Sequence, residues 1–334
     1  MIPGPANAIT DVPGIRVGHA EAPALLTGTT AVVPDRPATA AVSVAGGAPG
    51  TRGTTILAPS SVPTLVHAVV LSGGSAFGLD AAGGAMDWLR GQGVGFRMGS
   101  VRVPIVPSAI LFDLATGPAP AWEHPPWWEL GRQAAAGAAR SVALGNAGAG
   151  LGAKAGGLKG GLGTASLAGP GFTVGAIAVA NPLGSVTLPG SRAFWAWPFE
   201  RGGEFGAVAA PTAPVADLDH DFERFAAGAD GEGSAPNTTL AVVATDLALG
   251  RDETLRVAMM AQDGIARAIR PVHTPLDGDT VFVLATGAVP VRDPIATVAR
   301  AGMMAADCVA RAIARGVYEA APAAGLPAWR DLPA

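Results

Sequence analysis

Short apolar runs separated by turn residues dominate the chain, and they predict β-strands. The runs are rich in Val, Ile, Thr and Ala, and β-branched residues favour strands. They cover residues 15–17, 29–33, 41–44, 172–180, 240–244 and 281–285. A longer run, residues 103–114, predicts one more buried strand with a proline near its start.

Helical spacing follows the run at residues 69–72. Leu79, Ala82, Met86 and Leu89 recur at the period of a helix, and two glycines end the pattern at residues 91 and 93. Three further helices are predicted: an Ala-rich one that ends near residue 145, one over 253–269 with Asp252 as its N-cap, and a last one from Asp293-Pro294 toward Tyr318. Strands and helices mixed in this way predict layered α/β packing.

Composition narrows the class of protein to a folded, globular one. The 334 residues suffice for one large domain or two smaller ones. With 49% hydrophobic and only 14% charged residues, the chain is too apolar for disorder. Its 47 glycines and 29 prolines imply tight turns and closely packed layers.

Charge and cysteine content exclude several functions. A formal net charge of −4 gives no basic surface, so no nucleic-acid partner is expected. The single cysteine, Cys308, excludes an intrachain disulfide framework and a Cys-rich zinc site, and its apolar helical setting predicts a buried structural thiol. No signal peptide is visible at the start of the sequence. Residues 160–191 carry no charge, but prolines and glycines interrupt them, so strands are expected there and a membrane span is not. We expect a cytoplasmic protein.

Two glycine-rich segments resemble nucleotide or nucleophile motifs without matching them. Ser75 lacks the second glycine of a nucleophile elbow, because Phe77 stands there, and the spacing also fails the dinucleotide pattern. Residues 145–163 lack the Gly-Lys-Ser/Thr of a phosphate loop. The lysines of this segment, Lys154 and Lys159, are either solvated surface residues or charges that stabilise an anion near a site.

The junction Asn237-Thr238 is the sharpest candidate for chemistry. A loop-like stretch, residues 200–236, ends there and a buried strand begins. Self-cleavage before Thr238 would leave a hydroxyl nucleophile with its own α-amine as base. An ordinary loop-to-strand junction, a glycosylation acceptor and simple strand propensity remain open alternatives.

Three further polar residues stand at strand ends. Asn181 precedes Pro182 and either belongs to a turn or donates to an oxyanion. Asp277 and Asp279 flank a glycine before the run at 281–285, which is also typical of a generic turn. They offer too few oxygen ligands for calcium, and no metal or other cofactor is expected.

Several segments together resemble the DmpA/BapA-type self-processing aminopeptidases (peptidase family S58), especially their nylon-oligomer hydrolase branch. The matching segments run in order along most of the chain: residues 71–79, 104–114, 148–150, 159–163, 181–182, 237–239 and 273–280.

The resemblance implies an αββα sandwich, similar to N-terminal-nucleophile hydrolases but differently connected. It implies a single domain, residues 1–334, cleaved into fragments 1–237 and 238–334, and assembly into a homo-oligomer such as a tetramer. Thr238 is then the nucleophile, Asn181 an oxyanion or substrate-amide partner, and Asp277 and Asp279 the residues that orient the nucleophile and its amine.

Two departures from the family pattern stand out. Phe112 occupies the position of a tyrosine near the site in the nylon-hydrolase branch, so that hydroxyl is absent from the substrate pocket. The family's Gly-Lys after the Gly-Ala-Gly run is Gly156-Gly157 here, so Lys159 is the candidate for the lysine role, with Lys154 as the alternative.

The expected function is therefore a self-processing amide hydrolase that needs no cofactor. Short peptides, β-amino acid amides and aminohexanoate oligomers all suit this chemistry. The alternatives are a self-processing acyltransferase that passes the acyl group to an amine, and a non-enzymatic glycine-rich binding protein with an intact Asn237-Thr238 bond.

Overall fold

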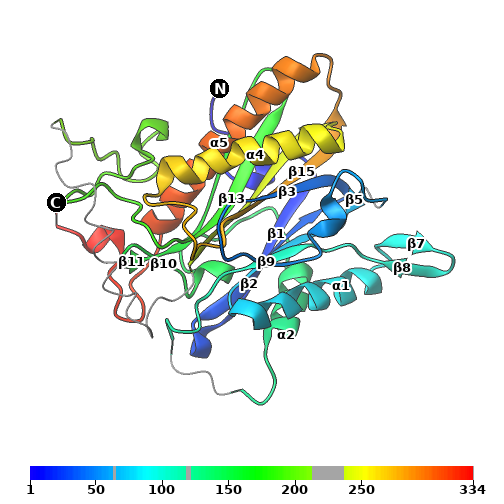
Figure 1. The fold of residues 1–334 in the computed structure, drawn as a ribbon, viewed down its shortest axis with the longest axis horizontal. Coiled ribbons are helices and arrows are strands. Elements are labelled where there is room, and N and C mark those ends of the chain that lie inside the picture. The colour runs from blue at the N-terminus through cyan, green and yellow to red at the C-terminus, as the bar shows by residue number, and fades with distance from the viewer. Residues whose placement is uncertain (63–64, 118–121, 213–236, 334) are drawn as a thin grey trace.

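The computed structural model describes residues 1–62, 65–117, 122–212 and 237–333. Within them two β-sheets lie face to face between two pairs of helices (Figure 1). The larger sheet has the order β12-β13-β14-β15-β3-β5 and the smaller one β1-β2-β6-β9-β4. The strands of the larger sheet are β3 (Ala38–Val44), β5 (Leu65–Val66), β12 (Gly161–Ala168), β13 (Thr173–Asn181), β14 (Thr238–Leu247) and β15 (Thr280–Val289). Those of the smaller sheet are β1 (Ile15–Ala22), β2 (Thr27–Pro34), β4 (Gly50–Arg52), β6 (Val69–Ser72) and β9 (Ser108–Ile110).

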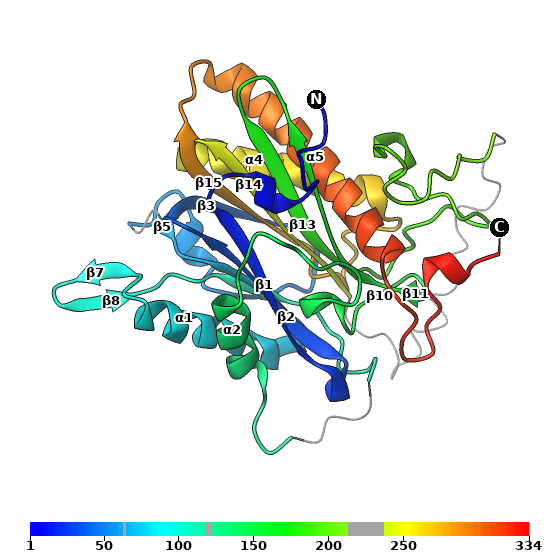
Figure 2. The ribbon, with the colours of Figure 1, turned by 180° about the vertical axis from the view of Figure 1, so that it is seen from behind.

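Each sheet is covered by its own helices. Helices α4 (Arg251–Ala268) and α5 (Pro294–Tyr318) pack on the larger sheet, and α1 (Ala81–Gly91) and α2 (Trp127–Ala136) pack on the smaller one (Figure 2). Three buried apolar clusters correspond to the three interfaces between these layers. The predicted αββα sandwich is therefore confirmed.

The central strand β14 shows why the apolar runs are continuous. Leu240, Val242 and Ala244 face the other sheet, whereas Ala241 and Val243 face the helices. Because side chains alternate between the two faces of a strand and both faces are buried, the run at 240–244 is apolar at every position. The uncharged stretch 160–191 likewise contains β12 and β13, and residues 182–191 follow them outside any strand. None of the helices in the described ranges is long and apolar enough to cross a membrane.

Two predicted elements are shorter than expected. The run at 103–114 is divided: β8 (Val101–Val103) pairs with β7 (Phe96–Met98), and β9 begins only after Pro107. Prolines 104 and 107 cannot donate to a strand ladder, which separates the two pieces. The Ala-rich helix ends at Ala136 and not near residue 145, because Ala139 and Gly145 pair their backbones with Val17 and Leu162.

The helix ends give one correction and one confirmation. Asp252 does not cap α4. Gly250 is the N-cap residue, and its N–H donates to the Glu253 side chain at 2.7 Å. Asp293 caps α5 as predicted, with its carboxylate accepting from Ala296 N at 3.2 Å. Cys308 on this helix is buried, and burial raises the pKa of its thiol to about 12.

The β7–β8 hairpin projects away from the layers (Figure 1). Phe96, Met98, Val101 and Val103 are all exposed on it. Exposed apolar groups of this kind are typical of contact surfaces, but the expected homo-oligomer stays a prediction.

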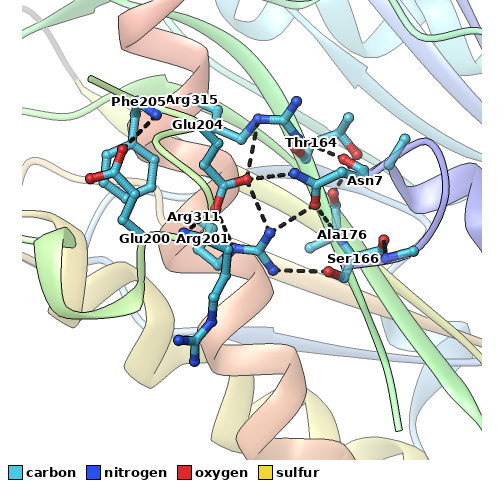
Figure 3. Close-up of polar contacts among 12 residues, drawn as sticks. Asn7, Thr164, Ser166, Ala176, Glu200, Arg201, Glu204, Phe205, Arg311 and Arg315 are labelled. Carbon is cyan, nitrogen blue, oxygen red and sulfur yellow. Dashed lines mark hydrogen bonds and ion pairs between the residues drawn. The ribbon is translucent and has the colours of Figure 1, made fainter. Parts of the chain in front are cut away.

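A buried ionic cluster ties α5 to segments far away in the sequence (Figure 3). The Arg311 guanidinium contacts Glu204 at 2.6 and 3.0 Å, Asn7 Oδ1 at 2.8 Å and Ser166 O at 2.8 Å. Arg315 also reaches Glu204 Oε2, at 3.6 Å. Glu204 and Asn7 lie before residue 237 and the two arginines after it, so the cluster joins the two predicted fragments.

Glu204→Gln should lower the free energy of unfolding by about 2–4 kcal/mol, because it leaves two buried guanidinium groups short of negative charge. Urea denaturation of the variant and the wild type measures this difference. The matched control is Glu129→Gln, which changes only surface contacts, with Arg132 and Gln133. Equal stability of the Glu204 variant and the wild type would contradict a stabilising role for the cluster.

Candidate active site

Strand pairing brings the predicted site residues to one end of the larger sheet. Asn181, the last residue of β13, lies opposite Thr238, the first residue of β14. β15 runs parallel to β14 on its other side, so the loop before β15 reaches the same end. Asn237 forms a backbone bridge with Asp277 in that loop. All of these residues are buried: Asn181, Asp277 and Asp279 are at most 1% exposed, and Thr238 is 3% exposed.

The peptide bond before Thr238 is held on both sides. Asn237 N donates to Leu276 O at 3.1 Å, and Gly278 N donates to Asn237 O at 2.8 Å. The Thr238 hydroxyl donates to the same carbonyl oxygen at 2.5 Å. Two donors therefore polarise this carbonyl group, and the Thr238 hydroxyl lies against it.

Gly278 makes room for the hydroxyl. A Cβ atom on residue 278 would lie 2.7 Å from Thr238 Oγ1 and 2.9 Å from Ala48 O, closer than side chains tolerate. Gly46 is similarly constrained, since a Cβ there would lie 2.1 Å from Asp277 O. The glycines that follow β3 thus let the backbone there lie against the loop at residues 274–279.

The two carboxylates hold this loop and the start of β14. Asp279 Oδ1 accepts from Thr239 N at 2.7 Å, and its Oδ2 accepts from His273 N at 3.2 Å and contacts His273 Nδ1 at 2.7 Å. Asp277 accepts from Thr274 N at 2.9 Å, from the Thr274 hydroxyl at 2.6 Å and from Leu183 N at 3.3 Å. Burial and the neighbouring Asp279 charge raise the pKa of Asp277.

Asn181 is oriented by backbone groups. Its Oδ1 accepts from Lys154 N at 3.0 Å, and its Nδ2 donates to Phe112 O at a long 3.4 Å. An amide nitrogen carries two hydrogens, so one remains for another acceptor at this end of the sheet. Phe112 is half-buried and touches Asn181 through its main chain.

Lys159, on the short strand β11 (Leu158–Lys159), is completely buried. Its Nζ donates to the carbonyls of Gly150, Ala153 and Gly160 at 2.8–2.9 Å. Burial lowers the pKa of this amine to about 7, and the Asp113 carboxylate acts in the opposite direction. Three acceptors match the three hydrogens of an ammonium group, so the contacts favour the charged form. Lys159 therefore holds residues 150–160 together through three carbonyl groups.

Two residues of this region are not among the predicted site residues. His273 lies in the family-matching segment 273–280 but has no predicted role; its backbone is left-handed at φ 53°, and its Nδ1 contacts Asp279 Oδ2 at 2.7 Å. Asp113 follows the predicted Phe112, and an acid at the end of an apolar run was the only available clue. Burial raises the pKa of the Asp113 carboxyl to about 6, against the lowering effects of the Thr27 hydroxyl, Gly74 N–H and Lys159. Gly74 N donates to it at 2.7 Å, whereas Thr27 lies close without a well-formed hydrogen bond.

Within the described ranges, no group of three or more His, Cys, Asp or Glu side chains is placed to hold a metal ion.

The four layers define an N-terminal-nucleophile-hydrolase-like fold. A β-aminopeptidase from Burkholderia sp. shares it with a TM-score of 0.67 and 23% sequence identity over 97% of this chain and 90% of that one. An L-aminopeptidase D-Ala-esterase/amidase from Ochrobactrum anthropi is described as a variant of the Ntn hydrolase fold. Its TM-score is 0.67 and its sequence identity 23%, over 96% of this chain and 88% of that one.

The chain belongs to peptidase family S58, whose profile matches residues 7–328. It is 44% identical to an uncharacterized aminopeptidase of Mycobacterium tuberculosis over 98% of both chains. It is 29% identical to a 6-aminohexanoate-oligomer endohydrolase of Paenarthrobacter ureafaciens, over 83% of this chain and 74% of that one. The protein is therefore a hydrolase of C–N amide bonds.

The buried Asp113 should make stability depend on pH. Because its pKa is raised on folding, the folded protein keeps a proton that the unfolded chain has already released, so the wild type loses stability as the pH rises from about 4 to about 6. Asp113→Asn has no proton to release there. Its stability relative to the wild type should rise by about 1–3 kcal/mol across this window. Urea denaturation at pH 4 and pH 6.5 measures the change, with surface Asp87→Asn as control; a pH-independent difference would contradict it.

Proposed function

We propose that this protein is a self-processing amide hydrolase with Thr238 as its N-terminal nucleophile. The observation that carries the proposal is the Thr238 hydroxyl at 2.5 Å from the carbonyl oxygen of the preceding peptide bond, which Gly278 N–H also contacts. In the uncleaved chain Thr238 has no free amine and is buried, so processing must precede turnover. Residues 213–236 of the predicted loop lie outside the described residues.

Processing begins with attack of Thr238 Oγ on the Asn237 carbonyl carbon. The new C–O bond replaces the C–N bond, and the hydroxyl proton ends on the Thr238 nitrogen. Water then hydrolyses the ester, which restores the hydroxyl and leaves fragment 1–237 with a carboxylate and fragment 238–334 with a free α-amine. Gly278 N–H stabilises the oxyanion of this step, a contribution worth about 10²–10³ in rate for a typical donor.

The electrostatics of the site support the second stage, in which the cleaved protein hydrolyses its substrate. Asp277 and Asp279 are buried next to each other, and the neighbouring Asp279 charge helps to raise the pKa of Asp277. The new α-ammonium group of Thr238 would supply a cation at the start of β14. Its neutral form takes the proton from Oγ, which attacks the substrate amide, while Asn181 Nδ2 donates to the oxyanion. The protonated amine then gives its proton to the departing amine, and water releases the acyl group.

The substrate class follows from the relatives. Their names include aminopeptidases and a 6-aminohexanoate-oligomer endohydrolase. We therefore propose short amides with a free amino end: peptides, β-amino acid amides or aminohexanoate oligomers. The ammonium form of Lys159 would favour anionic intermediates in this region.

Wild-type protein should give two bands on a denaturing gel, and the smaller fragment should begin Thr-Thr-Leu on N-terminal sequencing. Thr238→Ala removes the attacking oxygen and should stay full-length, with amide hydrolysis at least about 10³-fold lower. Thr238→Ser keeps a hydroxyl and serves as the matched control, which should still be cleaved. An active wild type with an unbroken chain through residues 237 and 238 would refute the mechanism.

Gly278→Ala should slow self-cleavage by about tenfold or more, because the new methyl group displaces the Thr238 hydroxyl from the carbonyl group. The fraction of full-length chain, followed over time after synthesis, measures the rate. Gly91→Ala is the control, since nothing lies within 4 Å of a Cβ at that position. Cleavage of both variants at the wild-type rate would show that the tight fit around Gly278 is unimportant.

A further inference from the structure

The amide group of Asn181 is held by two main-chain groups from different segments. Lys154 N, on the short strand β10 (Lys154–Ala155), donates to its Oδ1 at 3.0 Å, and its Nδ2 donates to Phe112 O at 3.4 Å. The remaining Nδ2 hydrogen is the one that the proposed mechanism directs at the oxyanion, and the positions of these two groups set its direction. A residue that fixes both groups would therefore control the orientation of Asn181 without touching it.

Asp113 ties down the first of these groups. It directly follows Phe112, its side chain is completely buried, and its Oδ1 accepts from Gly74 N at 2.7 Å. On the other side of Phe112, Leu111 O accepts from Ser75 N at 3.0 Å. The Phe112 carbonyl group is thus flanked on both sides by hydrogen bonds to the loop that follows β6.

The same side chain lies against the segment that carries the second group. A Cβ atom on Gly152 would lie 2.7 Å from Asp113 Cβ, 2.9 Å from Asp113 Oδ2 and 2.0 Å from Leu26 O, so this close approach requires glycine. Lys154 follows Gly152 by two residues, which span at most about 7 Å of extended chain. Asp113 is therefore next to both segments that hold the Asn181 amide.

Lys159 holds the second segment as well. Its Nζ donates to Gly150 O and to Ala153 O at 2.9 Å, and these residues lie on either side of Gly152. Its charge also acts on the Asp113 carboxyl group, whose pKa it lowers against the effect of burial. The two ionisable side chains therefore hold the same short segment, which leads directly into Lys154.

Asp113 is an unfavourable residue for structure alone. Burial raises the pKa of its carboxyl group to about 6, and its Oδ2 is buried without a hydrogen-bond partner among the described residues. The neighbouring Thr27 Oγ1 is unpartnered in the same way. A buried carboxyl group with an unsatisfied oxygen destabilises a fold, and such groups are frequent at functional sites.

We propose that Asp113 is a positioning residue for Asn181. It fixes the Phe112 carbonyl group directly and the Lys154 N–H through Gly152, and so it aims the Asn181 amide. The inference rests on the proposed amide hydrolysis and adds to it a residue that does not touch the substrate. Because Asp113 acts through contacts of fixed geometry, a change in the charge of its carboxyl group alters the surroundings of the Asn181 amide.

The first test reads the Asn181 amide directly and requires no turnover. The chain has four asparagines, Asn7, Asn146, Asn181 and Asn237, so selective ¹⁵N labelling of asparagine gives few side-chain amide signals in an NMR spectrum. Asn181→Asp identifies the signal of Asn181. In the wild type this signal should move between about pH 4.5 and about pH 7.5, with a midpoint near the Asp113 pKa of about 6.

Asp113→Asn keeps the shape of the side chain and removes its charge, so the movement should be lost. Surface Asp87→Asn is the matched control and should behave as the wild type. At any one pH the signals of the other three asparagines should coincide in Asp113→Asn and the wild type, which shows that the variant is folded.

Other ionisable groups near Asn181 are unchanged in this variant: Lys159, Asp277, Asp279 and His273. An Asn181 signal that moves equally in the wild type and in Asp113→Asn reports these groups and refutes the proposal. A wild-type signal that does not move refutes it too.

A double-mutant cycle on amide hydrolysis gives the second test. Asp113→Asn should lower kcat by about 3–10-fold, as expected for one weakened hydrogen bond, and change KM by less than about twofold, because Asn181 acts on the transition state. In Asn181→Ala, which lacks the amide, the same substitution should lower kcat by less than about twofold.

Equal losses in the two backgrounds would overturn the positioning role, because Asp113 would then act independently of Asn181. The two tests also separate this inference from the proposed function. If the wild type hydrolyses no amide while its Asn181 signal still follows Asp113, the proposed function fails and the coupling of the two residues stands.

Discussion

The backbone ladder through β13, β14 and β15 is the constraint on which the candidate site depends. Its register sets Asn181 opposite Thr238, and the parallel pairing of β14 with β15 carries Asp277 and Asp279 to the same end of the sheet. A slip of one residue would turn every side chain of β14 to the other face. Because Leu240 and Val243 are buried on opposite faces, against the second sheet and the helices, the burial of the strand and the geometry of the site are fixed together.

Close backbone approach gives the site its shape. Gly278 leaves space for the Thr238 hydroxyl, and Gly46 lets the end of β3 lie against the Asp277 carbonyl. The many glycines are therefore more than turn formers, since at these two positions any side chain would displace an atom of the site. The buried ionisable groups all have hydrogen-bond partners. Lys159 donates to three carbonyl groups, and the two aspartates accept from N–H and hydroxyl donors, with His273 also contacting Asp279.

Local sequence rules predicted the elements better than their ends. The run at 240–244 and the Asp293 cap of α5 have short-range causes, namely β-branched apolar residues and a side chain that accepts an N–H three residues on. The division of residues 103–114 and the early end of α2 have no such short-range cause. In the second case the backbone around Ala139 pairs with β1, a partner far away in the chain. Family resemblance supplied the layer order and the site candidates that periodicity alone left open.

The sequence by itself determined that this chain is an apolar, glycine-rich α/β protein with Thr238 at the start of a buried strand. It also brought Asn181, Asp277 and Asp279 into consideration as strand-end residues. Only the tertiary structure placed them at one end of the sheet around one peptide bond, joined His273 to Asp279, and brought the Asp113 carboxyl under the charge of Lys159. The physical reason is that propensity, capping and periodicity act over a few residues, whereas these contacts arise from strand register and layer packing between segments far apart in the chain.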